Sequence, residues 1–187
     1  MPVRLTAAQD IANEFTKQFG PLPLDFDVGV QIIEARNICA PGDESTRAFP
    51  SPFIIVTVHG EEMKSSRRVK DTSTHMFNKM MVFEVKKSSL DFFQGNIKLE
   101  VFDRRLLLSD VPIGSLHIGI ADVYMSANHR MPPQWFAIRD TKSEDFKEER
   151  GYLKLRLHVL GPTDKAVLEG PPLFDEYKVC ELLRSPR

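Results

Sequence analysis

The feature that most constrains the fold of this chain is the alternation of apolar and polar residues in short segments. Over residues 25–33, Phe26, Val28, Val30 and Ile32 are separated by single polar residues or glycine. Such alternation puts every second side chain on one side of an extended chain, which predicts a strand with one buried face. The same kind of segment predicts seven further strands, at residues 53–59, 62–70, 79–85, 97–102, 113–120, 135–138 and 152–160.

Clusters of Gly, Pro, Ser and Asp separate these segments, and they are the residues that form turns. Eight short strands punctuated in this way are typical of an all-β, antiparallel sandwich. Gly60 and Glu61 predict a tight hairpin between the second and third strands. The 187 residues are enough for one such domain with extensions.

A short amphipathic helix is predicted ahead of the strands, over residues 6–19. Ile11, Phe15 and Phe19 recur at a spacing of four, and Gly20 ends the pattern. A helix of this length is marginally stable in isolation, so we expect it to dock on the rest of the protein. The predicted organisation is a helix with a proline connector over 1–24, a β-sandwich domain over 25–161, and an irregular C-terminal linker over 162–187.

Composition excludes several classes of protein. The formal net charge of −1 provides no global field for nucleic acid, so any electrostatic partner must bind a local patch. No apolar run approaches the roughly 18 residues needed to cross a bilayer. Cys39 and Cys180 lie far apart in the sequence, which fits reduced thiols in the cytosol better than a disulfide framework.

Catalytic signatures are not found in the sequence. The five histidines have no metal-ligand spacing, neither cysteine belongs to a Cys-x-x-Cys pair, and no glycine-rich phosphate loop occurs. We therefore expect no enzymatic activity and no cofactor. Trp135 and Phe136 are interpreted as core anchors of the seventh strand.

Three adjacent leucines, Leu106, Leu107 and Leu108, occupy the connection between the fifth and sixth strands, directly after Arg104 and Arg105. Leucines in a tight connection are poorly accommodated in water, so they either fold back into the core or contact a membrane or partner. In the second case the leucines insert into the headgroup boundary of a bilayer while the arginines, with Arg47, contact anionic phosphates.

A second basic patch lies on the third predicted strand. Alternation places Lys64, Arg68 and Lys70 on one face and Arg67 on the other. This patch is interpreted in two ways: as a site for lipid headgroups, or as the charged edge strand that protects a sheet from aggregation.

Several strand sequences together resemble a C2 domain, a membrane-binding β-sandwich. They are Val30 to Ile38, Pro52 to Val58, Phe77 to Val85, Val101 to Asp103 with Ile113-Gly114, and Gly151 to Leu155. The resemblance covers residues 25–161 and implies an eight-stranded antiparallel C2 sandwich whose first strand lies at 25–33. It also supports the headgroup site on the third strand.

A narrower resemblance is to the second C2 domain of ferlins. It is carried by Gly151 to Lys154 running into Val159 to Asp164, and by the spacing of Asp103, Arg105 and Asp110 before Gly114. Ferlins are tail-anchored proteins of vesicle fusion and membrane repair that contain several C2 domains. The resemblance implies that this chain is an internal piece of such a protein.

Calcium-binding C2 domains gather carboxylates from two loops, because Ca²⁺ takes roughly six to eight oxygen ligands. Asp43, Asp103 and Asp110 are the candidate ligands here. Ser51 and Arg105 stand where the resemblance implies two further carboxylates, and a fixed cation at Arg105 would repel the metal. We therefore expect no high-affinity calcium site, and interpret the three aspartates as turn and strand-cap residues paired with Arg104 or Arg105.

Two functions follow from these observations. The first is a calcium-independent or weakly calcium-dependent phospholipid-docking module, peripheral on the cytoplasmic side of membranes, with anionic lipids as its partners. The second is a protein-interaction or scaffolding C2 domain, which binds neighbouring domains or trafficking proteins instead of lipid. Neither function involves nucleic acid.

Overall fold

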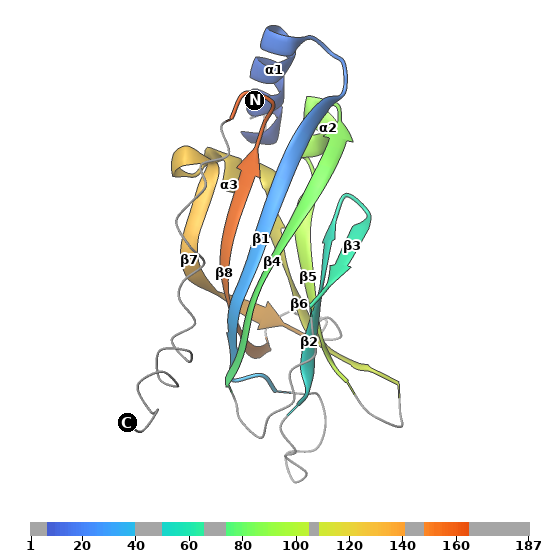
Figure 1. The fold of residues 1–187 in the computed structure, drawn as a ribbon, viewed down its shortest axis with the longest axis vertical. Helices are drawn as coiled ribbons and strands as arrows, with labels where there is room; N and C mark the ends of the chain where they lie inside the picture. The colour runs from blue at the N-terminus through green and yellow to red at the C-terminus, as the bar shows by residue number, and fades with distance from the viewer. Residues whose placement is uncertain (1–6, 40–49, 66–73, 105–108, 141–147, 165–187) are drawn as a thin grey trace, which may run out of the picture.

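The computed structural model describes residues 7–39, 50–65, 74–104, 109–140 and 148–164. These ranges contain eight strands, three α-helices and one short 3-10 helix (Figure 1). The elements are α1 (Ala7–Phe19), β1 (Leu24–Arg36), β2 (Pro52–Val58), β3 (Glu61–Lys64), β4 (Thr74–Lys87), α2 (Ser89–Phe93), β5 (Asn96–Asp103), β6 (Val111–Gly119), α3 (Ile120–Met125), the 3-10 helix (Ala127–His129), β7 (Arg130–Arg139) and β8 (Glu149–Leu160).

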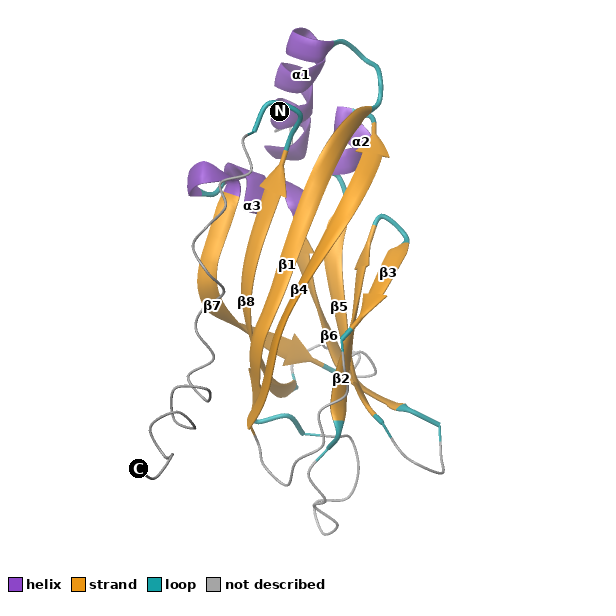
Figure 2. Cartoon of the chain, viewed as in Figure 1, coloured by secondary structure: helices purple, strands orange, loops and turns teal. Residues whose placement is uncertain are grey.

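The strands form two four-stranded layers, β3-β2-β5-β6 and β7-β8-β1-β4 (Figure 2). Neighbouring strands run antiparallel throughout. This confirms the predicted all-β, eight-stranded antiparallel sandwich, and the first strand, β1, lies between β8 and β4. Among the described residues, the layers are joined at a single register pair, Ser115 of β6 opposite Arg139 of β7.

Glycine is required beside this junction. A Cβ atom added at Gly114 would lie 2.5 Å from the Arg139 carbonyl oxygen, a separation that Cβ atoms essentially never show. The absence of a side chain at this point of β6 therefore lets the two layers meet.

The core is formed by the alternating apolar residues that the sequence predicts. Phe26, Val28, Val30 and Ile32 of β1 are each at most 1% exposed. On β8, Leu153, Leu155, Leu157 and Val159 are completely buried. The intervening residues of β8 therefore point outward and form part of the outer face of this layer.

Helix α1 docks on one end of the sandwich, as its amphipathic pattern predicts. Phe15 is 8% exposed, and its ring centroid lies 5.3 Å from that of Phe93 and 5.6 Å from that of Tyr124. Gly20 has a φ of +82° and donates its N–H to the Thr16 carbonyl, so the helix ends at the predicted glycine. Helices α2 and α3 lie at this same end, which we call the helix end (Figure 1).

Some predicted boundaries differ from the observed ones. Strand β3 ends at Lys64, and residues 66–70 of the predicted third strand lie outside the described residues. Strand β4 is longer than predicted because Asn78 adopts a left-handed conformation, φ +49°, which lets the strand continue through the irregular pairing with β1. The β2–β3 turn is formed by His59 and Gly60 and not by Gly60 and Glu61, since Val58 pairs with Glu61.

Trp135 is not a core anchor, and that prediction was wrong. Its side chain is 39% exposed and points outward from β7, while Phe136 is partly buried against the core. The irregular register between Met131 and Gln134 shifts the alternation of β7 relative to β8. A four-residue pattern does not reveal such a shift, and it therefore cannot assign the two aromatic residues to faces.

Candidate functional site: the loop-bearing end

The strand ends that flank four of the connections lie at the end of the sandwich opposite the helices, which we call the loop-bearing end (Figure 1). These connections join β1 to β2, β3 to β4, β5 to β6, and β7 to β8. The register places their described ends together: Arg36 lies opposite both Thr74 and Tyr152, and Asp103 lies opposite both Pro52 and Val111. Residues from distant parts of the sequence therefore meet at this end.

Hydrogen bonds at Asp103 join the end of the β1–β2 connection to the start of the β5–β6 connection. Its Oδ1 accepts a hydrogen bond of 2.8 Å from the Ser51 backbone N–H, and the Arg104 backbone N–H donates 3.1 Å to the Ser51 carbonyl. One oxygen of a candidate calcium ligand is thus engaged with the backbone before β2. This contact also fixes where the Arg104 to Ser109 segment begins.

Lys64 belongs to the predicted basic patch and is the last residue of β3, opposite Ile55 of β2. Its Nζ is 3.8 Å from the centroid of the Phe53 ring, which is itself stacked on Phe102 at 5.4 Å. A cation over an aromatic face is attracted by the ring quadrupole. This contact holds an exposed ammonium group beside the β2–β5 pair.

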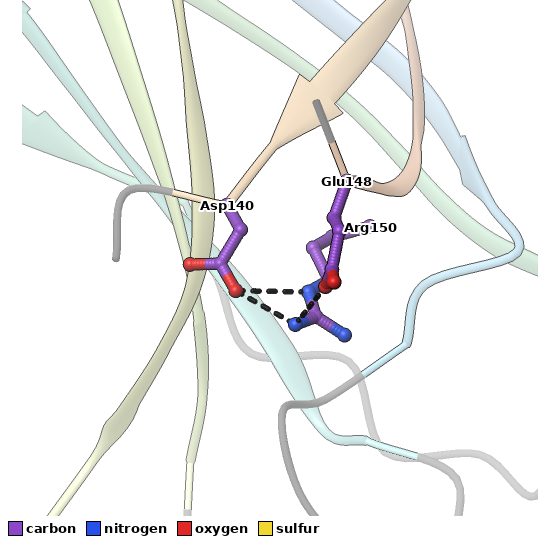
Figure 3. Close-up of polar contacts among 3 residues, drawn as sticks. All are labelled: Asp140, Glu148 and Arg150. Atoms are coloured by element: carbon purple, nitrogen blue, oxygen red, sulfur yellow. Dashed lines mark hydrogen bonds and ion pairs between the residues drawn. The ribbon is translucent and has the colours of Figure 1, made fainter. Parts of the chain in front are cut away.

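The base of the β7–β8 connection is closed by an ion-pair cluster that the sequence did not reveal (Figure 3). Arg150 donates from Nε and Nη2 to Asp140 Oδ2, at 3.1 and 2.7 Å, and from Nη2 to Glu148 Oε2 at 2.7 Å. The Asp140 side chain is 11% exposed, so its charge is largely removed from water and is compensated by the guanidinium. The polar composition of residues 140–150 is typical of a solvated loop, yet Asp140 is nearly buried.

The remaining predicted site residues fall into two groups. Arg104 and Asp110 are described and lie at the ends of the β5–β6 connection. The others lie outside the described residues: Asp43, Arg47, Arg68, Lys70, Arg105, Leu106, Leu107 and Leu108. The roles assigned to all of these residues stay predictions.

No assembled metal site occurs in the part of the chain that the structure describes: it holds no group of three or more His, Cys, Asp or Glu side chains able to bind one ion. The same ranges contain no helix with the length and apolar character needed to cross a bilayer. Asp103 and Asp110 are the two described members of the predicted calcium set. The expectation about calcium therefore stays a prediction.

The described groups with shifted pKa values have structural explanations. Burial lowers the pKa of His59, whose Nε2 lies 3.1 Å from the Phe92 carbonyl oxygen. Burial raises the pKa of Tyr124 to about 12, and a hydrogen bond to Glu149 raises the pKa of Tyr152. His59 and Tyr124 lie at the helix end, whereas Tyr152 lies near the loop-bearing end, so these three groups do not form one site.

Comparison with known proteins identifies the fold family. A model of the C2 domain family matches residues 27–138. Myoferlin from Mus musculus is 25% identical over 150 residues, which is 80% of this chain and 7% of myoferlin. Myoferlin from Homo sapiens is 24% identical over 177 residues, or 91% of this chain and 8% of myoferlin. The chain therefore spans less than a tenth of the length of these relatives.

Solved structures support the same fold. The calcium-bound pair of C2 domains from extended synaptotagmin 2 superposes with a TM-score of 0.57 at 21% identity, covering 75% of this chain and 47% of that one. Human GIVD cytosolic phospholipase A2 superposes with a TM-score of 0.53 at 15% identity, covering 76% of this chain and 17% of the enzyme. Because identities this low show the fold alone, neither likeness assigns an activity. The family match spans more than half of the residues, and on that basis this chain belongs to the C2 domain family and is similar in sequence to ferlins.

Proposed function

We propose that this chain is a non-enzymatic, peripheral membrane-docking C2 module of a ferlin-like protein, on the cytoplasmic side of membranes. In this proposal its loop-bearing end binds anionic phospholipids with little or no dependence on calcium. The observation that carries the proposal is where the strands on either side of the leucine-containing connection end. Asp103 and Val111, the strand ends that flank it, pair with each other, and Asp103 pairs with Pro52 at the loop-bearing end.

The expected affinity is modest and reversible. Inserting two leucines contributes roughly 3 to 6 kcal/mol, at about 1.5 to 3 kcal/mol each. Arg104 and Arg105 near an anionic surface add about 1 kcal/mol each. The total of roughly 5 to 8 kcal/mol corresponds to dissociation constants from about 10⁻⁴ to 10⁻⁶ M. Lys64, Arg68 and Lys70 are proposed to add headgroup contacts.

Weak calcium dependence is supported by the contacts that the described carboxylates at this end already make. Asp103 accepts from the Ser51 backbone, and Asp140 is compensated by Arg150. A hard dication would have to displace these partners or collect its oxygens elsewhere. Asp43, Asp103 and Asp110 are therefore proposed to serve as turn and cap residues, and no cofactor is proposed.

The test is co-sedimentation with vesicles of phosphatidylcholine alone, or with added phosphatidylserine or phosphoinositide, in calcium and in chelator. We expect binding to the anionic vesicles in both conditions. The double variant Leu107→Ser, Leu108→Ser should lose at least about 100-fold in apparent affinity, because two apolar side chains no longer enter the bilayer. The matched control is Leu22→Ser, since Leu22 is 70% exposed and lies at the helix end.

Three outcomes would contradict the proposal. Binding that requires calcium would show that the carboxylates do collect a metal ion. Equal losses in the loop variant and in Leu22→Ser would show that the leucine segment is not the contact. No binding to any vesicle would exclude lipid docking and favour the scaffolding function, in which neighbouring domains or trafficking proteins are the partners.

A further inference from the structure

The outer face of the β7-β8-β1-β4 layer carries the exposed side chain of Trp135, the only tryptophan of the chain. Trp135 lies opposite Lys154 in the β7–β8 register, and Lys154 lies opposite Glu34 in the β8–β1 register. We call the outward-pointing residues around it the Trp135 face: Glu34, Arg36, Trp135, Tyr152, Lys154 and Arg156.

Two cations lie over the tryptophan ring. The Arg36 guanidinium carbon is 4.9 Å from the ring centroid and the Lys154 Nζ is 5.7 Å from it. Both distances are within the range in which a cation is attracted by an aromatic face. The ring and the two cations thus form one surface, built from the consecutive strands β7 and β8 and from β1, which is distant in the sequence.

Charge on this face is positive. Arg36, Lys154 and Arg156 provide three cations, and the nearest carboxylate, Glu34, is nearly buried and is bound by Arg36 Nε at 2.5 Å. At the margin, Glu149 is hydrogen-bonded to the Tyr152 hydroxyl. The face therefore presents an excess of positive charge around an exposed aromatic ring.

Apolar side chains extend the face across the edge strand. Met76, Met80 and Val82 of β4 are 40%, 44% and 43% exposed. Met76 shares a row with Glu34, Lys154 and Trp135 across the four strands of the layer. The cations therefore lie between an exposed tryptophan and an exposed apolar strip. This arrangement is complementary to a bilayer surface, which has anionic headgroups outside and an apolar interior beneath them.

We propose that the Trp135 face is a second contact surface for anionic bilayers. This inference rests on the proposed function and adds a second contact surface to it. The Trp135 face reaches the loop-bearing end, because Arg36 is the last residue of β1. A domain tilted onto this flank brings Trp135 to headgroup depth, where tryptophan is preferentially found. Lys154 and Arg36 then contact lipid phosphates while the Met76, Met80 and Val82 strip lies along the bilayer.

The single tryptophan allows a direct test. The full chain is titrated with vesicles of phosphatidylcholine, either pure or with about 30% phosphatidylserine as the anionic lipid. Trp135 emission and co-sedimentation are measured on the same samples. We expect the Trp135 emission to shift to shorter wavelength with the anionic vesicles and not with pure phosphatidylcholine. We also expect this emission to be quenched by lipids brominated near the headgroup end of the acyl chain. Lys154→Glu should raise the lipid concentration that gives the half-maximal emission response about 30-fold, because the charge near the surface changes by two units, at about 1 kcal/mol each.

The matched control is Lys86→Glu, which makes the same charge change on the same outer face but at the helix end. Lys86 is exposed and pairs only loosely with Asp25, at 3.5 Å. Circular dichroism and thermal melting establish that both variants fold. Equal losses in the two variants would overturn the assignment, because net charge alone would then explain binding.

The two proposals fail in different ways. Vesicle binding with an unchanged, unquenched Trp135 emission would overturn the Trp135 face and leave docking through the leucine segment standing. No vesicle binding at all would overturn both. Trp135 emission that responds to an acidic peptide and not to anionic vesicles would assign the face to a protein partner, and would likewise overturn the proposal.

Discussion

Replacing Phe15 by alanine should detach helix α1 while leaving the sandwich folded. The Phe15 ring is 8% exposed and lies within 5.7 Å, centroid to centroid, of Phe26, Phe93 and Tyr124. Truncating a buried phenylalanine costs about 3 to 5 kcal/mol in lost contacts and cavity. A helix of 13 residues is marginal without such contacts, so a loss of this size should exceed what holds α1 in place.

Hydrogen exchange followed by mass spectrometry measures this directly. In Phe15→Ala we expect peptides from residues 7–19 to exchange nearly as fast as an unfolded chain, while peptides from β1 and β8 keep their protection. Glu14→Ala is the matched control, because Glu14 is the exposed neighbour on the same helix. Retained protection in α1, or loss of protection throughout β1 and β8, would refute the reasoning that α1 is a separately docked element.

Two further predictions concern stability. Arg150→Ala should lower the free energy of unfolding by about 1 to 3 kcal/mol in urea titrations, since it removes the guanidinium that donates to the nearly buried Asp140 carboxylate. Arg150→Lys should recover only part of this, because lysine lacks the guanidinium fork, and full stability in the alanine variant would contradict the cluster's role. Burial raises the pKa of Tyr124 to about 12, whereas in the unfolded chain it titrates near 10, so the folded state holds this proton more tightly. The stabilisation that protonated Tyr124 contributes is complete below pH 10 and is lost as the pH rises toward 12. The free energy of unfolding should therefore fall less steeply over that interval in Tyr124→Phe, and an unchanged dependence on pH would contradict this.

The eight strands could be predicted from the sequence because each carries its own local signal. The alternation in β1 and β8 reports a buried face directly, since side chains in a strand point to opposite sides in turn. Gly20 likewise marks the end of α1 because a glycine can adopt the left-handed conformation that terminates a helix. These features depend on residues close together in the chain.

The features that were missed depend on residues far apart or on very short elements. Helices α2 and α3 contain five and six residues, too few to show a helical period. The Asp140–Arg150 pair lies inside a polar run, which looks like a solvated loop until the backbone brings the two side chains together. Trp135 acquires its cationic neighbours from β1 and β8, and nothing near residue 135 in the sequence indicates them.

The division of the sandwich into two ends favours surface contacts away from α1. The first described residues form α1, and the last, Asp164, lies 3.6 Å from His129 beside α3, so the described chain both enters and leaves at the helix end. That end is filled by the rings of Phe15, Phe26, Phe93 and Tyr124, whose contacts are internal. The loop-bearing end and the Trp135 face both carry cations, and neither is crossed by those segments where the structure describes them. A docking partner can therefore reach the charged surfaces without displacing α1, which is why the Phe15→Ala variant should keep its vesicle binding even as its helix detaches.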